Sequence, residues 1–594
     1  MVDEFCQSYE EEIRSLGGIG FFLGGIGPDG HIAFNVAGSS HFSHTRLTGI
    51  NYETQATAAT DLGGIELVRK KAVITMGLET ITHNPNTVAI IMAAGQSKSH
   101  VVANALQQES QLLYPASALH KLAGARFYIT KSATTELELR PSAVESLYKC
   151  HALPANYYEK LVVDASLQHR IGLSDLPAEV QLTDEKLQLA EKLSGVKVPS
   201  LLTGVFDSIE SKIARGLESY TGERFLHTGP HHDDIELAYF PLLHHLVRSR
   251  ENENYFVYCT SGFTSVTNDY LRKCFVDLAR DIDNGQLAYA DGYRNLFRPE
   301  HAQDDITGYL QGIAHQNIDR QTLYVSARLA RNIARHIGTE SVEAVQRFIH
   351  EHLTLIDSQQ AGRREPEIIQ TFKGWLREFE AELVWAHFGI GKERVHHLRL
   401  PFYTSDIFPQ YPDPEKDVVP ILDLLRKIRP TVVSLALDPE GSGPDTHFKT
   451  LIALSEAIDL YAAENPDIPL RIWGYRNVWS RFKLHEVNMI VPISLNSFAV
   501  LHNMFNSCFL SQRSASFPSY EYDGSFSELA QRVWEQQFED LVQLMGGDFF
   551  YSSANPMMRR SYGAIYLKAM SYAEFSEYMQ PVRRLLTMKD TLTK

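Results

Sequence analysis

A short string of histidine and aspartate, His231-His232-Asp233-Asp234, has the residue types and spacing of a metal site. It follows an apolar segment expected to be a strand and precedes an expected helix over 236–247. His231 and Asp234 lie three residues apart and can place an imidazole nitrogen and a carboxylate on one ion, which zinc accepts. Asp233, beside them, could take a proton from a metal-bound water.

The third ligand of such a site must come from a distant loop. The segment 438–447 also follows an apolar stretch, and its prolines and glycines turn the chain toward His447 at the start of the next helix. The sequence therefore predicts a site for zinc, or a similar divalent metal. We assign its ligands as His231, Asp234 and His447, with Asp233 as the catalytic base and with His227 and His232 either as structural residues or as supports of the ligands. The alternative is that the two aspartates only cap a helix.

A second candidate site lies in the glycine-rich string Gly25–Asn35, which follows an apolar segment over 19–23. A glycine-rich loop alone is weak evidence of phosphate binding. This one also holds Asp29 and His31, and a histidine next to a carboxylate can transfer protons near neutral pH. The alternative is a tight turn in which His31 only packs in the core.

The string Gly25–Asn35, with Thr75-Met76-Gly77 and Gly95-Gln96-Ser97-Lys98, resembles glucosamine-6-phosphate deaminases, which convert that sugar phosphate to fructose-6-phosphate and ammonia. The resemblance implies that His31 promotes opening of the sugar ring, that Asp29 adjusts the acid–base behaviour of His31 and that Lys98 contacts the phosphate. Arg46 aligns with an arginine that some members use for an allosteric phosphate.

The chain departs from the deaminase pattern in two positions and in extent. Val36 stands where the family has a glutamate, and Thr60 where many members have a phosphate-binding arginine. The match begins in the middle of the family's domain, so we expect its first half, with a phosphate-binding loop, to be missing. The remaining half-sheet is expected to expose an apolar edge that a partner must cover.

The histidine and aspartate string resembles the LmbE-like, or PIG-L, zinc deacetylases, which remove N-acetyl groups from glucosamine-bearing substrates. Their first motif matches from His231 to Glu236. Their second motif, His-Pro-Asp-His, matches only in part, because Gly443 replaces its first histidine and one residue is inserted before His447. The resemblance implies metal-assisted amide hydrolysis.

Expected strands alternate with expected helices around both sites. This alternation predicts an α/β fold with two Rossmann-like parallel-sheet units, the second with a helical insertion. Expected strands lie at 19–23, 87–94, 125–130, 224–227, 255–259, 431–437, 470–473 and 487–491. We divide the chain into a deaminase-like unit (1–146), a connector (147–222), a deacetylase-like unit (223–500) with a helical insertion at about 265–385, and a C-terminal helical extension (501–594).

Composition limits the function classes. The 594 residues carry a net charge of −16, which argues against nucleic acid or an anionic membrane as a partner. Five scattered cysteines, the lack of an apolar run of roughly 20 residues and the lack of a secretion signal predict a cytoplasmic protein without membrane insertion.

We therefore expect a homo-oligomeric enzyme of amino-sugar catabolism, a hydrolase with a deaminase-like unit, acting on a small amino sugar or sugar phosphate. The alternative is a non-catalytic protein that binds or senses a sugar phosphate through degenerate sites.

Overall fold

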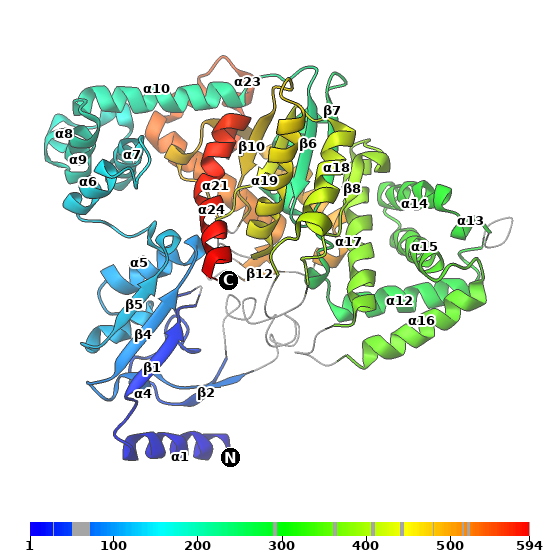
Figure 1. Cartoon of the computed structure of the whole chain (residues 1–594), viewed down its shortest axis with the longest axis horizontal. Coiled ribbons are helices and arrows are strands. Elements are labelled where there is room, and N and C mark those ends of the chain that lie inside the picture. Colours follow the sequence, from blue (N-terminus) through cyan, green and yellow to red (C-terminus); the bar gives the residue numbers. More distant parts are fainter. Residues whose placement is uncertain are drawn as a thin grey trace. The chain divides into compact units, whose positions relative to one another are not determined.

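The computed structural model describes residues 1–27, 29–49, 72–288, 294–359, 365–404, 410–439, 445–478, 480–513, 516–518 and 523–592. The chain falls into two compact units. The first comprises Met1–Ala155, Asp438–Phe448 and Ser516–Ser525, and the second comprises Asn156–Leu437, Lys449–Ala515 and Phe526–Lys594. The prediction of a mixed α/β chain with parallel-stranded sheets is confirmed (Figure 1).

A three-stranded parallel sheet, in the order β1-β4-β5, forms the centre of the first unit. Its strands are β1 (Phe21–Gly25), β4 (Val88–Ala93) and β5 (Arg126–Ile129). Each was expected from a short apolar run, and each lies within two residues of the expected bounds. A separate antiparallel pair joins β2 (Arg46–Thr48) to β3 (Val73–Thr75).

Helices cover one face of the three-stranded sheet. The helical elements of this unit are α1 (Val2–Ser15), α4 (Leu78–Thr82), η1 (Gln96–Lys98), α5 (Ser99–Gln107), η2 (Pro115–Lys121) and α6 (Pro141–Lys149). The core of the unit lies between the sheet and α4, α5 and η2, where Ile91 of β4 packs with Val102 of α5 and Leu119 of η2. The side chains of β1, β4 and β5 that alternate with the core residues point away from it.

The second unit begins with four helices and continues into a seven-stranded sheet. The helices are α7 (Tyr157–His169), α8 (Ala178–Thr183), α9 (Glu185–Ser194) and α10 (Val198–Gly216). The sheet has the order β11-β14-β10-β9-β6-β7-β8. Its strands are β6 (Arg224–Gly229), β7 (Glu253–Tyr258), β8 (Val395–His397), β9 (Val432–Ala436), β10 (Arg471–Tyr475), β11 (Met489–Ser494) and β14 (Ser561–Ser571).

The described chain between β7 and β8 is helical. It contains α12 (Asn268–Asp283), α13 (Arg294–Phe297), α14 (Ala302–Ala314), α15 (Ile318–Ile337), α16 (Val342–Asp357) and α17 (Glu367–His387). In α15, the Asn317 side chain accepts a hydrogen bond from the Arg320 amide, and Gly338 ends the helix with φ +66°. Buried Asp305 of α14 pairs with Arg328 and Arg331 of α15, which fixes this helix pair.

The remaining helices flank the sheet and extend to the C-terminal region. They are α11 (Asp234–Leu246), α18 (Val419–Ile428), α19 (Asp445–Glu464), α20 (Leu495–Cys508), α21 (Phe526–Met545), α22 (Gly547–Tyr551), α23 (Pro556–Arg559) and α24 (Tyr572–Leu592). The region 501–594, expected as a C-terminal helical extension, also contains β14, which pairs antiparallel with both β10 and β11. None of the described helices is both long and apolar enough to cross a membrane.

Candidate functional site

A tight loop after β1 carries the first group of predicted residues. The Gly27 amide donates to the His31 carbonyl at 2.8 Å, and Gly30 takes a φ of +81° between them. The imidazole of His31 lies against Gly27, so closely that a Cβ at position 27 would be 1.9 Å from the ring Cε1. Only glycine therefore fits beneath the ring.

Asp29 orients the His31 ring. Its Oδ1 lies 2.5 Å from His31 Nδ1 and accepts from the His31 amide at 3.3 Å, while its Oδ2 accepts from the Ala37 amide. The Asp29 side chain is 2% exposed and that of His31 12%, so the carboxylate sits behind the ring and the ring reaches the surface. A buried carboxylate that fixes one ring nitrogen is the arrangement of an oriented acid–base histidine.

Lys98 reaches the same group from the neighbouring strand. Gly95, with φ +90°, turns the chain after β4 into η1, which ends at Lys98 just before α5. Burial lowers the pKa of Lys98 to about 8, against the opposing attraction of Asp29. The structure thus brings Asp29, His31 and Lys98 together at the carboxyl ends of the paired strands β1 and β4, where ligands bind in open α/β sheets.

Arg46 hydrogen-bonds to residues other than Asp29, His31 and Lys98. Its Nη1 donates to the Asn35 side-chain oxygen at 2.8 Å, and its Nη2 to the Ser39 hydroxyl at 3.4 Å. Buried Asn35 donates in turn to the Ile32 and Met76 carbonyls. In this structure Arg46 therefore fixes the end of the His31 loop. Thr60 lies outside the described residues.

The predicted metal ligands also meet after two paired strands, β6 and β9. One ligand atom each from His231, Asp234 and His447 lies within 4.8 Å of the other two. His447 lies in the first turn of α19, which is one continuous helix from Asp445 to Glu464. Nδ1 of His447 lies 2.8 Å from Asp438 Oδ2, and Asp234 Oδ2 accepts from the His231 amide at 2.7 Å. Gly443 lies outside the described residues.

Asp233 has a partner that the sequence did not reveal. Nη2 of Arg377, on α17, lies 3.0 Å from Asp233 Oδ2, and Nη1 of the same guanidinium lies 3.0 Å from Glu380 Oε2. The Arg377 side chain is fully buried, and the Ser511 amide and hydroxyl donate to the Glu380 carboxylate. The residue predicted as a base is thus one end of a buried ion-pair network.

The two neighbouring histidines, His227 and His232, lie in the buried core. The buried ring of His227 contacts the Tyr239 hydroxyl at 3.0 Å and the Asn254 side-chain oxygen at 3.1 Å, and burial lowers its pKa to about 4. His232 stacks on Tyr258 and lies 3.2 Å from a ring nitrogen of His397. Burial holds the pKa of His232 well below its ordinary value, so both rings are neutral core groups.

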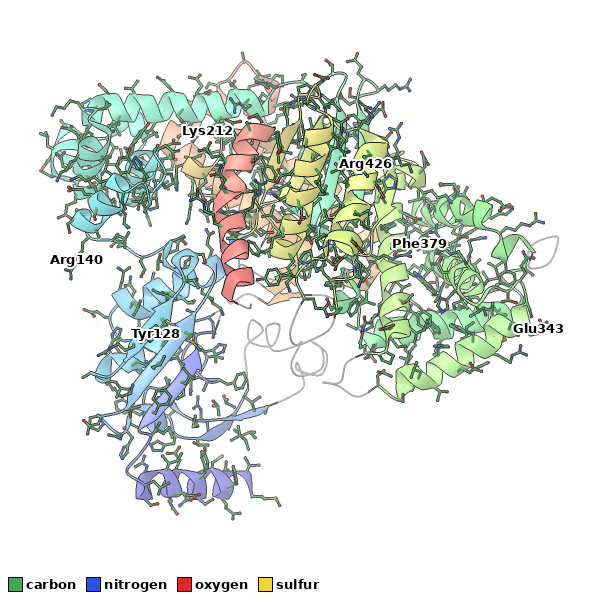
Figure 2. The ribbon with its side chains drawn as sticks, in the orientation of Figure 1. Tyr128, Arg140, Lys212, Glu343, Phe379 and Arg426 are labelled. Atoms are coloured by element: carbon green, nitrogen blue, oxygen red, sulfur yellow. The ribbon has the colours of Figure 1, made fainter. Side chains whose placement is uncertain are left out.

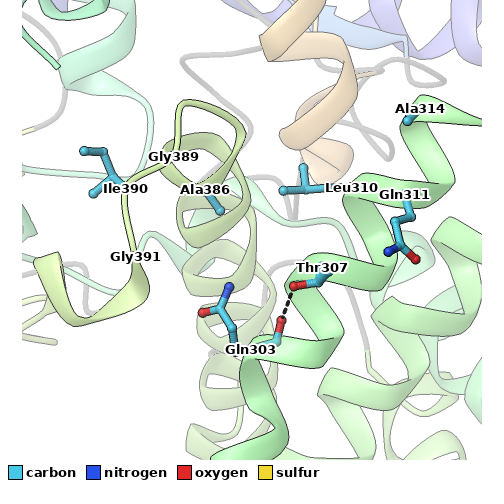
Figure 3. A pocket seen from close by; sticks show the side chains of 9 residues that line it. All are labelled: Gln303, Thr307, Leu310, Gln311, Ala314, Ala386, Gly389, Ile390 and Gly391. Carbon is cyan, nitrogen blue, oxygen red and sulfur yellow. Dashed lines mark hydrogen bonds between the residues drawn. The ribbon is translucent and has the colours of Figure 1, made fainter. Parts of the chain in front are cut away.

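A separate cavity of about 440 Å³ lies between α14 and the end of α17 (Figure 3). Its lining residues are Gln303, Thr307, Leu310, Gln311, Ala314, Ala386, Gly389, Ile390 and Gly391. The Thr307 hydroxyl donates to the Gln303 carbonyl across one turn of α14. None of the predicted site residues lines this cavity.

Comparison with known proteins relates part of this α/β chain to amino-sugar enzymes. No protein-family model matches the chain. A protein of Bacteroides thetaiotaomicron named as glucosamine-6-phosphate deaminase-like is 26% identical over 520 residues, which is 83% of this chain and 67% of the relative.

Shorter matches are to proteins named glucosamine-6-phosphate deaminase. That of Borreliella afzelii is 36% identical over 139 residues, 23% of this chain and 51% of the relative. That of Caenorhabditis elegans is 37% identical over 136 residues, with 23% and 50% covered. A solved monomeric glucosamine-6-phosphate deaminase is 33% identical with a TM-score of 0.21, covering 23% of this chain and 55% of the other.

Part of the chain is therefore homologous to glucosamine-6-phosphate deaminases, and the chain spans about half the length of these deaminases. The expectation of a hydrolase with metal-dependent deacetylase activity is wrong, because the relatives are named deaminases and none of those reported is named a deacetylase. The prediction that Asp233 is the catalytic base depended on that hydrolysis and loses its basis.

Proposed function

We propose that the protein acts in amino-sugar metabolism and that its first unit binds glucosamine-6-phosphate, or a close amino-sugar phosphate, at His31, Asp29 and Lys98. The observation that carries this proposal is the meeting of an oriented histidine–aspartate pair and a half-buried lysine after two adjacent parallel strands. Deaminase homology over part of the chain supports the same substrate class.

Each side chain has a distinct task in this proposal. The Lys98 ammonium attracts the phosphate dianion, and burial strengthens that attraction because little water screens it. The partly exposed His31 ring transfers a proton to or from the sugar-ring oxygen during ring opening, while Asp29 keeps the ring in one orientation. The reaction would consume water and release ammonia and a ketose phosphate.

Calorimetric titration with glucosamine-6-phosphate tests the site. We expect Lys98→Met to weaken binding at least about tenfold, because a charge-assisted contact is lost. His31→Asn should reduce ammonia release more than binding. Lys149→Met is the matched control, since Lys149 is an exposed lysine at the end of α6. Equal affinity of wild type and Lys98→Met, or no binding by wild type, would refute the site.

A second candidate function is a non-catalytic protein that binds or senses the sugar phosphate. The observation in its favour is that Val36 stands in the His31 loop where the deaminase pattern has a glutamate. Binding without detectable ammonia release in a coupled assay would select this function over catalysis.

We also propose that His231, Asp234 and His447 bind one zinc or similar divalent ion. Their donor set and their mutual distances within 4.8 Å fit such an ion. Asp438, 2.8 Å from Nδ1, orients the His447 ring so that Nε2 would be the ligand, a support that metal-binding histidines generally have. A bound divalent ion would supply a Lewis-acid centre.

Metal analysis of the purified chain after dialysis against zinc tests this proposal. We expect about one ion per chain, as at comparable sites, and loss of the ion in Asp234→Ala and in His447→Ala. His301→Ala is the control, because His301 is a partly exposed histidine that pairs with an aspartate elsewhere in the unit. Metal retained in both ligand variants would refute the assignment.

A further inference from the structure

A second cavity lies among the helices between β7 and β8. It has a volume of about 120 Å³ and is bounded by α12, α14, α15 and the short turn η10 (Leu510–Gln512). At roughly 30 Å³ per water molecule, this is the space of about four waters, which suits a small ion or one functional group of a larger ligand. We call this cavity the α12–α15 pocket.

The charged side chains that line the α12–α15 pocket are Lys273, Asp277 and Arg513. Lys273 and Asp277 pair with each other at 3.1 Å, and the second oxygen of Asp277 lies 2.8 Å from Arg280. Among the described residues, Arg513 donates to two backbone carbonyls of α20 and contacts the Tyr309 side chain, and it pairs with no carboxylate. Two cations and one carboxylate give this lining a net positive charge, in a chain whose net charge is −16.

The walls of the pocket add polar groups that are neutral. Tyr270 and Tyr309 line it, together with Gln321 and Thr322 of α15. Burial raises the pKa of both tyrosines, so their hydroxyls stay protonated at neutral pH. Burial also raises the pKa of the Cys274 thiol in the lining to about 12. A bound anion would therefore meet hydroxyl, amide and thiol groups beside the two cations, and no thiolate or phenolate that repels it.

Buried contacts hold the pocket in shape without a ligand. The Tyr309 hydroxyl donates to the Ser507 carbonyl at 2.7 Å, and its ring meets that of Phe379 edge to face, with 6.1 Å between the ring centroids. Figure 2 shows Phe379 on α17. The turn η10 is fixed by Ser511, whose amide and hydroxyl both donate to the buried carboxylate of Glu380. Because the walls are already ordered, a ligand loses little binding free energy in ordering them.

We propose that the α12–α15 pocket binds a phosphate-type oxyanion, which is either inorganic phosphate or the phosphate group of a small metabolite. Arg513 is the main ligand, because its planar guanidinium has more N–H donors than the two carbonyls use and matches the geometry of phosphate oxygens. Lys273, whose side chain is 66% exposed, adds positive charge at the rim. The rest of a metabolite would extend past Ile318, which lines the pocket and is 74% exposed. All lining residues belong to the second unit, so this pocket is separate from the proposed sugar-phosphate site of the first.

Calorimetric titration of the full chain with inorganic phosphate tests the pocket. Every chain in the series carries Lys98→Met, because Lys98 is itself proposed to bind a phosphate, and we expect one binding event in this background. Arg513→Gln should weaken binding at least about tenfold, because a charge-assisted contact is lost. Thr322→Glu, which brings a carboxylate into the pocket, should abolish binding. Arg272→Gln is the matched control, since it removes the same charge from α12 but this arginine pairs with an aspartate outside the pocket.

Amide exchange shows where the ion binds. Phosphate should slow exchange in α12 and η10 of the Lys98→Met chain and leave the strands of the first unit unchanged. A titration with glycerol phosphate distinguishes the two sources of the anion. Tighter binding than that of inorganic phosphate would support a metabolite's phosphate group, and equal or weaker binding would support the free ion.

Three results would overturn the proposal. The first is no phosphate binding by the Lys98→Met chain. The second is equal affinity of Arg513→Gln and Arg272→Gln, which would mean that binding follows the overall charge of the chain and not this pocket. The third is the same slowing of amide exchange by chloride at equal ionic strength, which would mean that the groups around Arg513 do not recognise a phosphate-type oxyanion.

Discussion

Replacing Lys98 by methionine should stabilise the unliganded protein while removing its sugar-phosphate response. Burial lowers the pKa of Lys98 from 10.5 to about 8 in the folded chain. The unfolded chain therefore binds more protons between pH 8 and 10.5, and the stability of the first unit rises with pH across that window. At 1.36 kcal/mol per unit, the charged lysine costs the folded state about 3 kcal/mol at pH 7 and about 1 kcal/mol at pH 10.

Pulse proteolysis in a urea series, with protection of residues 1–155 read by mass spectrometry, measures this difference in the full chain. We expect Lys98→Met to unfold at higher urea than wild type at pH 7, with a smaller gain at pH 10. Saturating glucosamine-6-phosphate should stabilise wild type and leave Lys98→Met unchanged. Lys149→Met should match wild type throughout.

Two results would refute the reasoning. A Lys98→Met chain less stable than wild type at pH 7 would mean that the ammonium contributes net stabilising contacts. A gain of equal size at pH 7 and pH 10 would mean that the effect is apolar packing and not the cost of a buried charge.

Three further predictions concern other parts of the molecule. Gly27→Ala should abolish glucosamine-6-phosphate binding because its Cβ displaces the ring above it, whereas Gly20→Ala, with no atom within 4 Å, should not; calorimetry distinguishes them. Arg377→Leu should cost about 3–5 kcal/mol in urea unfolding followed by tryptophan fluorescence, because it leaves the buried Glu380 and the partly buried Asp233 without their ion-pair partner. Arg426→Leu, which breaks an exposed ion pair, should unfold at nearly the same urea concentration as the wild type. Burial lowers the pKa of His227 from 6.5 to about 4, so stability should fall by about 3 kcal/mol from pH 6.5 to 4, and less in His227→Gln.

The sequence predicts much of both sheets because their strands are short apolar runs bounded by turn residues. The run at 88–93 is an example, since its β-branched residues and the following glycine indicate a buried parallel strand. The strand β14 was missed for a physical reason. Its apolar residues read equally well as part of a buried helix, and it forms a strand only because β10 and β11 pair with both of its edges.

Site side chains from distant parts of the chain are harder to predict than those that lie close together in the sequence. The spacing within 29–31 and within 231–234 is local, so the residue types could be recognised directly in the sequence. The contact of Arg377 with Asp233 depends on how α17 packs after the helices between β7 and β8, and no local pattern records that packing. Lys98 lies between these cases, because it follows the strand next to β1 and the adjacency of those strands could be anticipated.

The failed hydrolase prediction shows that residue types can indicate a possible ligand set without indicating the reaction. Two imidazoles and a carboxylate with ligand atoms within 4.8 Å of one another are a donor set suited to an ion that accepts nitrogen and oxygen ligands, whatever the reaction. A reaction requires in addition a group placed to move a proton, and the residue expected to do this is held 3.0 Å from a buried guanidinium. The His31 group differs in that the ring we propose for proton transfer is oriented by a buried carboxylate and reaches the surface.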